Sequence, residues 1–182
     1  MSKPSSGHFS GTAGSKTTKI ISQKSDSRVI ISSKDIDTRE HPTKYKQLGS
    51  KKLKLLREKV ENRTITKKEY KRLDWQNRLT KRLNKAVKDF WFFERIRIAR
   101  NLPTTRNWSA EQRQTILSGK RPKYKGRTME SHHTYSVAKY PHLANRFDLI
   151  YPATHYEHIY GFHGGNTKNS LPGVPIKYTK EF

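Results

Sequence analysis

The 182-residue chain contains no cysteine, so neither disulfides nor thiolate metal ligands take part in its fold. Any metal ion must therefore be held by histidine and oxygen ligands. Hydrophobic residues make up only 31% of the chain, and no apolar run approaches the roughly 20 residues of a membrane-spanning helix. Residues 1–15 lack a charged region followed by an apolar one, so we expect no secretory signal peptide and export, if it occurs, by another route.

Acidic residues are also scarce, because 15 Asp and Glu stand against 39 Lys and Arg, which gives a net charge of +24. Such an excess attracts phosphate polymers or anionic membranes, and the lack of an apolar span favours the polymers. Residues 43–127 hold 27 Lys and Arg against seven acids, whereas residues 130–182 hold five against four. The plainer interpretation of the basic part is a solvated face, but its charge exceeds what solubility requires, so we expect it to contact a nucleic-acid backbone.

The order of local patterns predicts an α+β fold. Residues 1–43 are rich in Ser, Thr, Gly and Lys and are predicted to be a flexible tail or linker. Residues 44–119 carry helical periodicity and are predicted to form a basic helical part of the domain that fills 44–182. The three predicted helices run from Ser50 to near Asn62, from the Thr66–Glu69 capping box to before Pro103, and from Ser109 to Gly119.

The pattern changes after a basic loop at residues 120–127. Short β-like pieces follow at 127–135 and 148–151. A short helix is then expected from Thr154, and it should unwind at the glycine pair 164–165. The chain is therefore predicted to pack a basic helical part with a small unit of two strands and a helix.

Six of the eight histidines lie between residues 132 and 163. Neutral imidazole accepts a proton near pH 7 and binds divalent ions, so the adjacent His132 and His133 can divide the roles of metal ligand and general base. On a regular strand these two side chains point to opposite faces, so both serve one site only at a strand end or bulge. A structural metal site or chance enrichment is the alternative interpretation of the cluster.

The downstream histidines have helical spacing. His155 and His158 lie about 60° apart on a helix, close enough to share a metal ion. His158 and His163 lie about 140° apart on a regular helix, so they converge only if the turn after Gly161 loosens. The remaining histidines, His8, His41 and His142, are interpreted as ordinary surface or core residues.

Together these spacings resemble the HNH motif (ββα-metal, His-Me finger) of colicin-type DNases and of the GHH and endonuclease VII-like toxin domains of bacterial polymorphic toxins. The resemblance covers residues 120–176, about a third of the chain. It rests on Glu130, His132, His133, Asp148, His158 and His163.

The resemblance implies a role for each matching residue. His132, His158 and His163 would hold one divalent ion (Mg, Mn, Ni or Zn), with His155 as a rival ligand. His133 would be the general base. Asp148 would orient that base where the family usually has Asn, and Asn145 is the rival for this role.

Basic residues upstream of the histidine pair are expected to bind the substrate. The resemblance implies that Arg127 and Glu130 help to hold the phosphate. The nucleic-acid contacts are predicted at Lys120, Arg121, Lys123, Lys125 and Arg127.

The resulting hypothesis is a metal-dependent endonuclease, a DNase toxin module of a bacterial antagonism system. The resemblance also implies an immunity protein, expected to be acidic, and activity in the cytoplasm of the target cell. An RNase toxin of the same fold and a non-catalytic basic nucleic-acid-binding protein are the alternatives.

Overall fold

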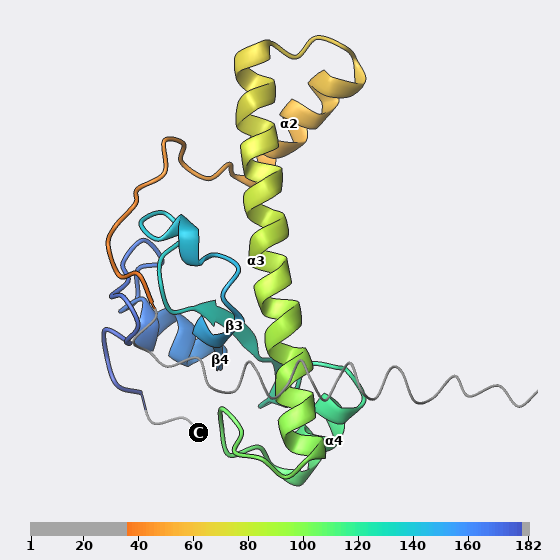
Figure 1. The fold of residues 1–182 in the computed structure, drawn as a ribbon, viewed down its shortest axis with the longest axis vertical. Coiled ribbons are helices and arrows are strands. Elements are labelled where there is room, and N and C mark those ends of the chain that lie inside the picture. Colours follow the sequence, from red (N-terminus) through yellow and green to blue (C-terminus); the bar gives the residue numbers. More distant parts are fainter. Residues whose placement is uncertain (1–35, 180–182) are drawn as a thin grey trace, which may run out of the picture. The chain divides into compact units, whose positions relative to one another are not determined.

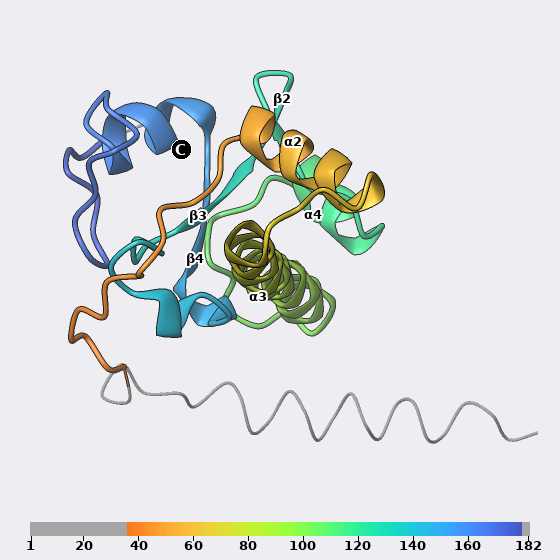
Figure 2. The same cartoon turned by 90° about the horizontal axis from the view of Figure 1, so that it is seen from above.

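The computed structural model describes residues 36–179, and all of its helices and strands belong to the compact unit that begins at Thr38. The α+β prediction is confirmed: a long helix, α3, has a two-stranded ribbon on one side and a short helix, α4, on the other (Figure 1 and Figure 2). The elements are α2 (Ser50–Glu61), α3 (Lys67–Ala99), α4 (Ala110–Leu117), β1 (Lys123–Tyr124), β2 (Arg127–Thr128), β3 (Glu130–His133), the 3-10 turns η2 (Pro141–Leu143) and η3 (Phe147–Leu149), β4 (Ile150–Ala153) and the π-helix η4 (Glu157–Phe162).

Helix α3 is the support on which the other elements pack. It begins with the predicted capping box, in which Thr66 and Glu69 exchange side-chain-to-backbone hydrogen bonds. At 33 residues it is about 50 Å long, and none of the helices within residues 36–179 is both long and apolar enough to cross a membrane. Its apolar face enters three buried clusters, which contain Leu79 with Val137 and Ala144; Ala86, Phe90 and Phe93 with Phe147 and Ile150; and Ile98 with Trp108, Ile116 and Met129.

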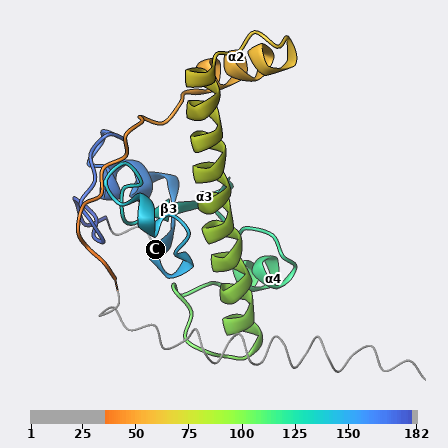
Figure 3. The same ribbon diagram turned by 45° about the horizontal axis from the view of Figure 1, so that its top comes forward.

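Helix α2 lies across the beginning of α3 (Figure 3). The helix begins at Ser50, as predicted, and its N-cap is Gly49, where no side chain forms a capping hydrogen bond. Leu56 is buried, and Lys59 Nζ lies 2.6 Å from Glu69 Oε1, so an ion pair joins the end of α2 to the start of α3.

The segment predicted as a basic loop is a small antiparallel hairpin of β1 and β2. Its two turn residues, Lys125 and Gly126, both have positive φ (46° and 79°), which suits the twist of a two-residue hairpin. The predicted strand at 127–135 is broken at Met129, whose side chain is buried in the core.

Strands β3 and β4 form the ribbon that carries the histidine pair. They are antiparallel, with His132 opposite Tyr151 and His133 opposite Ile150. Because His133 is the last residue of β3, the ribbon ends where the general base was predicted.

The predicted tail, 1–43, is described only from residue 36 onward. Its last part is attached to the domain, because the His41 amide donates to Lys139 O (2.7 Å) and the Thr43 amide to Ala138 O (3.2 Å). The prediction for residues 1–35 lies outside the described residues.

Candidate functional site

Three histidines predicted as metal ligands converge in the structure. His132 comes from β3, His158 from η4, and His163 from the residue that follows η4. Each offers a ring nitrogen, and the three nitrogens lie within 4.8 Å of one another. The donor set therefore fits a divalent ion that accepts imidazole ligands, such as Zn²⁺ or Ni²⁺, and it needs no thiolate.

The five-residue spacing of His158 and His163 is accommodated by a change of helix type. Residues 157–162 form a π-helix, and the His163 amide donates to His158 O (3.2 Å) across five residues. Side chains five apart lie closer to one face of this wider helix than on an α-helix, and the two ring centroids are 4.9 Å apart. The sequence required a wider turn after Gly161, and the structure instead widens the whole helical segment 157–162.

Hydrogen bonds at Nδ1 orient two of the three imidazoles. His158 Nδ1 donates to Glu130 Oε2, and His163 Nδ1 donates to the backbone oxygen of Asn169 (2.6 Å). This arrangement fixes the tautomer and leaves Nε2 of both rings to bind a metal. Glu130 was predicted to hold phosphate, but its carboxylate is engaged by His158 and, at 2.7 Å, by His155.

The Glu130 carboxylate stays ionised in this environment. Partial burial acts to raise its pKa, but the hydrogen bonds from His155 and His158 outweigh burial and lower the pKa below its usual value. An ionised carboxylate behind a ligand imidazole increases the basicity of that ligand.

His132 is the buried member of the group. It is 5% exposed, and its ring packs against Phe162 at a centroid distance of 4.1 Å. Burial, with the nearby rings of His158 and His163, lowers the pKa of His132 to about 3. The side chain is therefore neutral at physiological pH and has a lone pair for a metal.

His133 has the features of a proton acceptor. The backbone of Ala144 hydrogen-bonds its ring, and its Nε2 atom is buried without a hydrogen-bond partner among residues 36–179, which leaves Nδ1 for Ala144. Burial lowers the pKa of His133, although the Ala144 bond acts to raise it, so the ring is neutral near pH 7. An unsatisfied buried nitrogen in a fixed tautomer can accept a proton.

Neither side chain predicted to orient His133 makes that contact among the described residues. Asp148 is held by Arg146 through two bonds of 2.8 and 2.6 Å. The Asn145 side chain accepts from Arg82 Nη2 (3.1 Å). The orienting contact comes instead from the main chain of Ala144, a group that no residue type in the sequence can reveal.

An ion pair that the sequence did not predict anchors η4. Arg106 donates to both carboxylate oxygens of Glu157 (2.6 and 2.8 Å) and to Pro152 O (2.8 Å), and both charged side chains are at least nine-tenths buried. Glu157 also closes a capping box with Thr154. The pair therefore joins the loop after α3, the end of β4 and the first turn of η4.

The C-terminal segment also supports the site. Besides the Asn169 oxygen on His163, the Gly173 amide donates to Thr134 O (2.7 Å) and the Lys177 amide donates to Gly161 O (3.0 Å). The chain after η4 is thus hydrogen-bonded both to the residue that follows the histidine strand and to η4.

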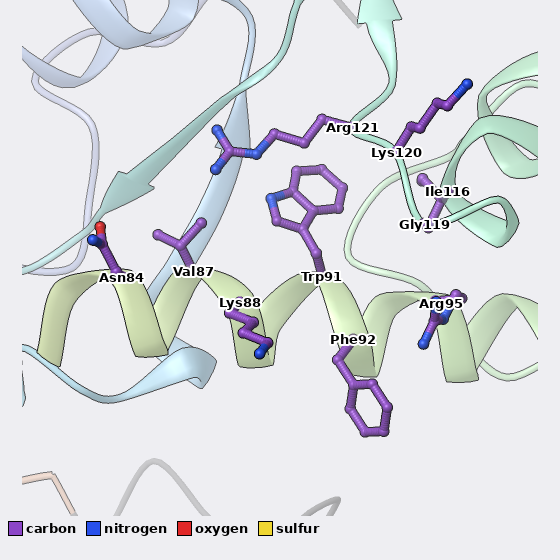
Figure 4. A pocket seen from close by; sticks show the side chains of 10 residues that line it. All are labelled: Asn84, Val87, Lys88, Trp91, Phe92, Arg95, Ile116, Gly119, Lys120 and Arg121. Carbon is purple, nitrogen blue, oxygen red and sulfur yellow. The ribbon is translucent and has the colours of Figure 1, made fainter. Parts of the chain in front are cut away.

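The structure distributes the predicted nucleic-acid contacts over three hollows. Lys123 and Lys125 line one of them beside Trp108 and Gln112. Lys125 and Arg127 line a second beside His155, Tyr156 and Tyr160. Lys120 and Arg121 line another along α3 (Figure 4). His155, the rival ligand, is outside the three-nitrogen group. The rings of His41 and His142 pack against each other with their centroids 4.7 Å apart.

The partner of His158 gives a first prediction. Glu130→Gln should lower the affinity for a divalent ion by about 10- to 100-fold, because the carboxylate that orients a ligand imidazole is lost. Calorimetric titration of Zn²⁺ or Ni²⁺ measures the change. Asp148→Asn is the matched control, since Asp148 is bonded to Arg146 rather than to a histidine of the group. Equal affinities for Glu130→Gln and the unmodified protein would contradict the proposed orientation.

The buried ion pair of Arg106 and Glu157 gives a second prediction. Arg106→Met leaves the Glu157 carboxylate buried without its charge partner, so the free energy of unfolding should fall by about 3–5 kcal/mol. Replacing both residues, as Arg106→Met with Glu157→Leu, should recover much of the loss. Urea denaturation followed by circular dichroism measures both variants, and a loss under 1 kcal/mol for the single change would refute this role.

Comparison with known proteins bears on the same residues. A model of the family described as GHH signature containing HNH/Endo VII superfamily nuclease toxin matches residues 73–154. The match includes His132 and His133 and ends just before the helical turn that carries His158. No curated protein and no solved structure matches the chain. Residues 73–154 are thus similar to the nuclease toxins of the GHH-signature HNH/Endo VII superfamily, the family that the histidine motifs indicated.

Proposed function

We propose that the protein is a metal-dependent endonuclease that cleaves DNA as the toxin module of a bacterial antagonism system. The convergence of His132, His158 and His163 carries this proposal, because three imidazole nitrogens suit one divalent ion. The neighbouring His133 supplies a neutral ring with a free Nε2. The family match supports a nuclease toxin, and the high positive charge supports a polyanionic substrate.

Hydrolysis of a phosphodiester requires a base for water and compensation for negative charge. His133 Nε2 accepts a proton from the attacking water while the Ala144 main chain holds its ring. The oxygen then bonds to phosphorus and the bond to the 3′-oxygen breaks. A divalent ion on His132, His158 and His163 would supply positive charge next to that departing oxygen. Arg127, on the neighbouring β2, is assigned to the phosphate.

A toxin of this kind requires protection of the cell that makes it. We assign that role to an immunity protein with an acidic surface, since the basic residues 43–127 would attract it. The toxin would act in the cytoplasm of the target cell.

The central experiment compares substrates with and without metal. Purified protein should nick and linearise supercoiled plasmid when Mg²⁺, Mn²⁺, Ni²⁺ or Zn²⁺ is supplied, and EDTA should abolish cleavage. Total RNA is incubated in parallel, and cleavage of RNA with intact plasmid would identify an RNase toxin. If neither polymer is cut with any of these ions, the protein is a nucleic-acid-binding protein rather than an enzyme.

Loss of the general base and loss of a metal ligand should have different effects. His133→Ala should lower the cleavage rate by about 10²–10⁴-fold, as expected for a missing proton acceptor, and should retain metal affinity. His158→Ala should weaken metal affinity itself, and excess metal should restore part of the activity. Calorimetric titration together with plasmid cleavage separates the two. Loss of metal binding in His133→Ala with normal binding in His132→Ala would mean that the pair is assigned in reverse.

A further inference from the structure

A basic hollow lies along α3, between that helix and the segment that leads from α4 to β1 (Figure 4). Its volume is about 440 Å³, enough for a nucleotide-sized group. The apolar part of its wall consists of Val87, Trp91 and Ile116. Basic side chains line the rest of it. The hollow is separate from the three-histidine group, because no residue of that group lines it.

The charge around this hollow is not neutralised. Lys88, Arg95, Lys120 and Arg121 line it, no acid does, and none of these four forms an ion pair within residues 36–179. Other cations of α3 do have acidic partners: Lys85 pairs with Asp89, and Arg97 pairs with Glu94. Four cations along one hollow, with no acid among the residues that line it, favour an anionic ligand.

The wall of the hollow contains an aromatic ring suited to stacking. Trp91 is half-buried, and in Figure 4 its indole lies between α3 and the guanidinium of Arg121. Trp91 Nε1 donates to Ser131 Oγ (2.9 Å), which fixes the plane of the indole. A fixed aromatic face next to several cations is the arrangement that binds single-stranded nucleic acid, with bases on the ring and phosphates on the cations.

We propose that this hollow binds an unpaired nucleotide of the nucleic-acid substrate, with its base on Trp91 and its phosphates on the four surrounding cations. The proposal rests on the nuclease function and adds a substrate class to it. Bases in a duplex are covered on both faces by their neighbours, so only an unstacked base can use the ring. The enzyme should therefore prefer single-stranded or locally opened nucleic acid.

The position of Ser131 connects this hollow to the general base. Ser131 and His133 alternate with His132 along β3. Their side chains therefore point to one face of the ribbon, and the side chain of His132 points to the other. Trp91 contacts that same face through Ser131. A strand held on Trp91 would thus approach the ribbon from the side of His133.

Binding can be measured without cleavage. The probe is a fluorescein-labelled single strand of about 12 nucleotides, compared with a hairpin duplex of the same sequence, on the full chain carrying His133→Ala in EDTA. The single strand should bind more tightly than the duplex and should quench tryptophan fluorescence. Trp91→Leu should weaken single-strand binding about tenfold, whereas Trp91→Phe should keep the affinity and lose most of the quenching.

The cations are tested against a matched control. Lys120→Ala with Arg121→Ala removes two charges from the hollow, and Lys67→Ala with Lys68→Ala removes two exposed charges from the start of α3. The first pair should reduce single-strand affinity at least several-fold more than the second at the same salt concentration. Equal effects of the two pairs would overturn the proposal.

Two further outcomes would also overturn it. One is tighter binding of the duplex than of the single strand, and the other is unchanged single-strand affinity in Trp91→Leu. Neither outcome bears on hydrolysis, which plasmid and RNA cleavage by the unmodified protein test separately. Conversely, a protein that cuts neither polymer but binds single strands through Trp91 would retain this site and lose the proposed catalysis.

Discussion

The ion pair between Arg106 and Glu157 is the interaction on which the geometry of the three-histidine group depends. Helix η4 has six residues, and a helix so short is not stable without tertiary contacts. Its first turn is fixed because Glu157 accepts from Arg106, which extends from the loop that follows α3. Since Arg106 also donates to Pro152 O on β4, the partner of the histidine strand β3, one guanidinium holds η4 to the ribbon.

The helix type matters as much as its anchorage. On an α-helix, His158 and His163 would diverge, and one of them would leave the group. The π-helix keeps both rings on one side, and the lack of a side chain at Gly161 lets Thr179 and the Lys177 carbonyl approach this turn, since a Cβ there would lie 3.0 Å from Thr179 Oγ1. Burial of Phe162 against the His132 ring adds an apolar contact that this uncommon turn needs.

Much of the fold was predictable, because its strongest signals are local. The capping boxes at Thr66 and Ser109 and the apolar stripe between them gave α3 and α4 nearly to the residue. The histidine spacings indicated which side chains converge. The hairpin at Lys125 was missed, because two-residue strands have no periodicity. Arg106 was missed because nothing distinguishes one basic residue among 39 until burial is known, and the orienting groups at Ala144 and Asn169 are main-chain atoms that carry no residue signature.

Helix α3 runs unbroken through Leu73, where the family match begins, so the border of the shared segment falls inside a rigid rod rather than in a linker. Each residue of an α-helix turns the chain by about 100°. An insertion or deletion of one residue between Glu69 and Leu73 would therefore rotate α2, together with its ion pair between Lys59 and Glu69, about the axis of α3 by that angle relative to the rest of the domain. If this segment has been exchanged among proteins during evolution, each exchange had to preserve the helical phase of α3 at its border as well as the reading frame.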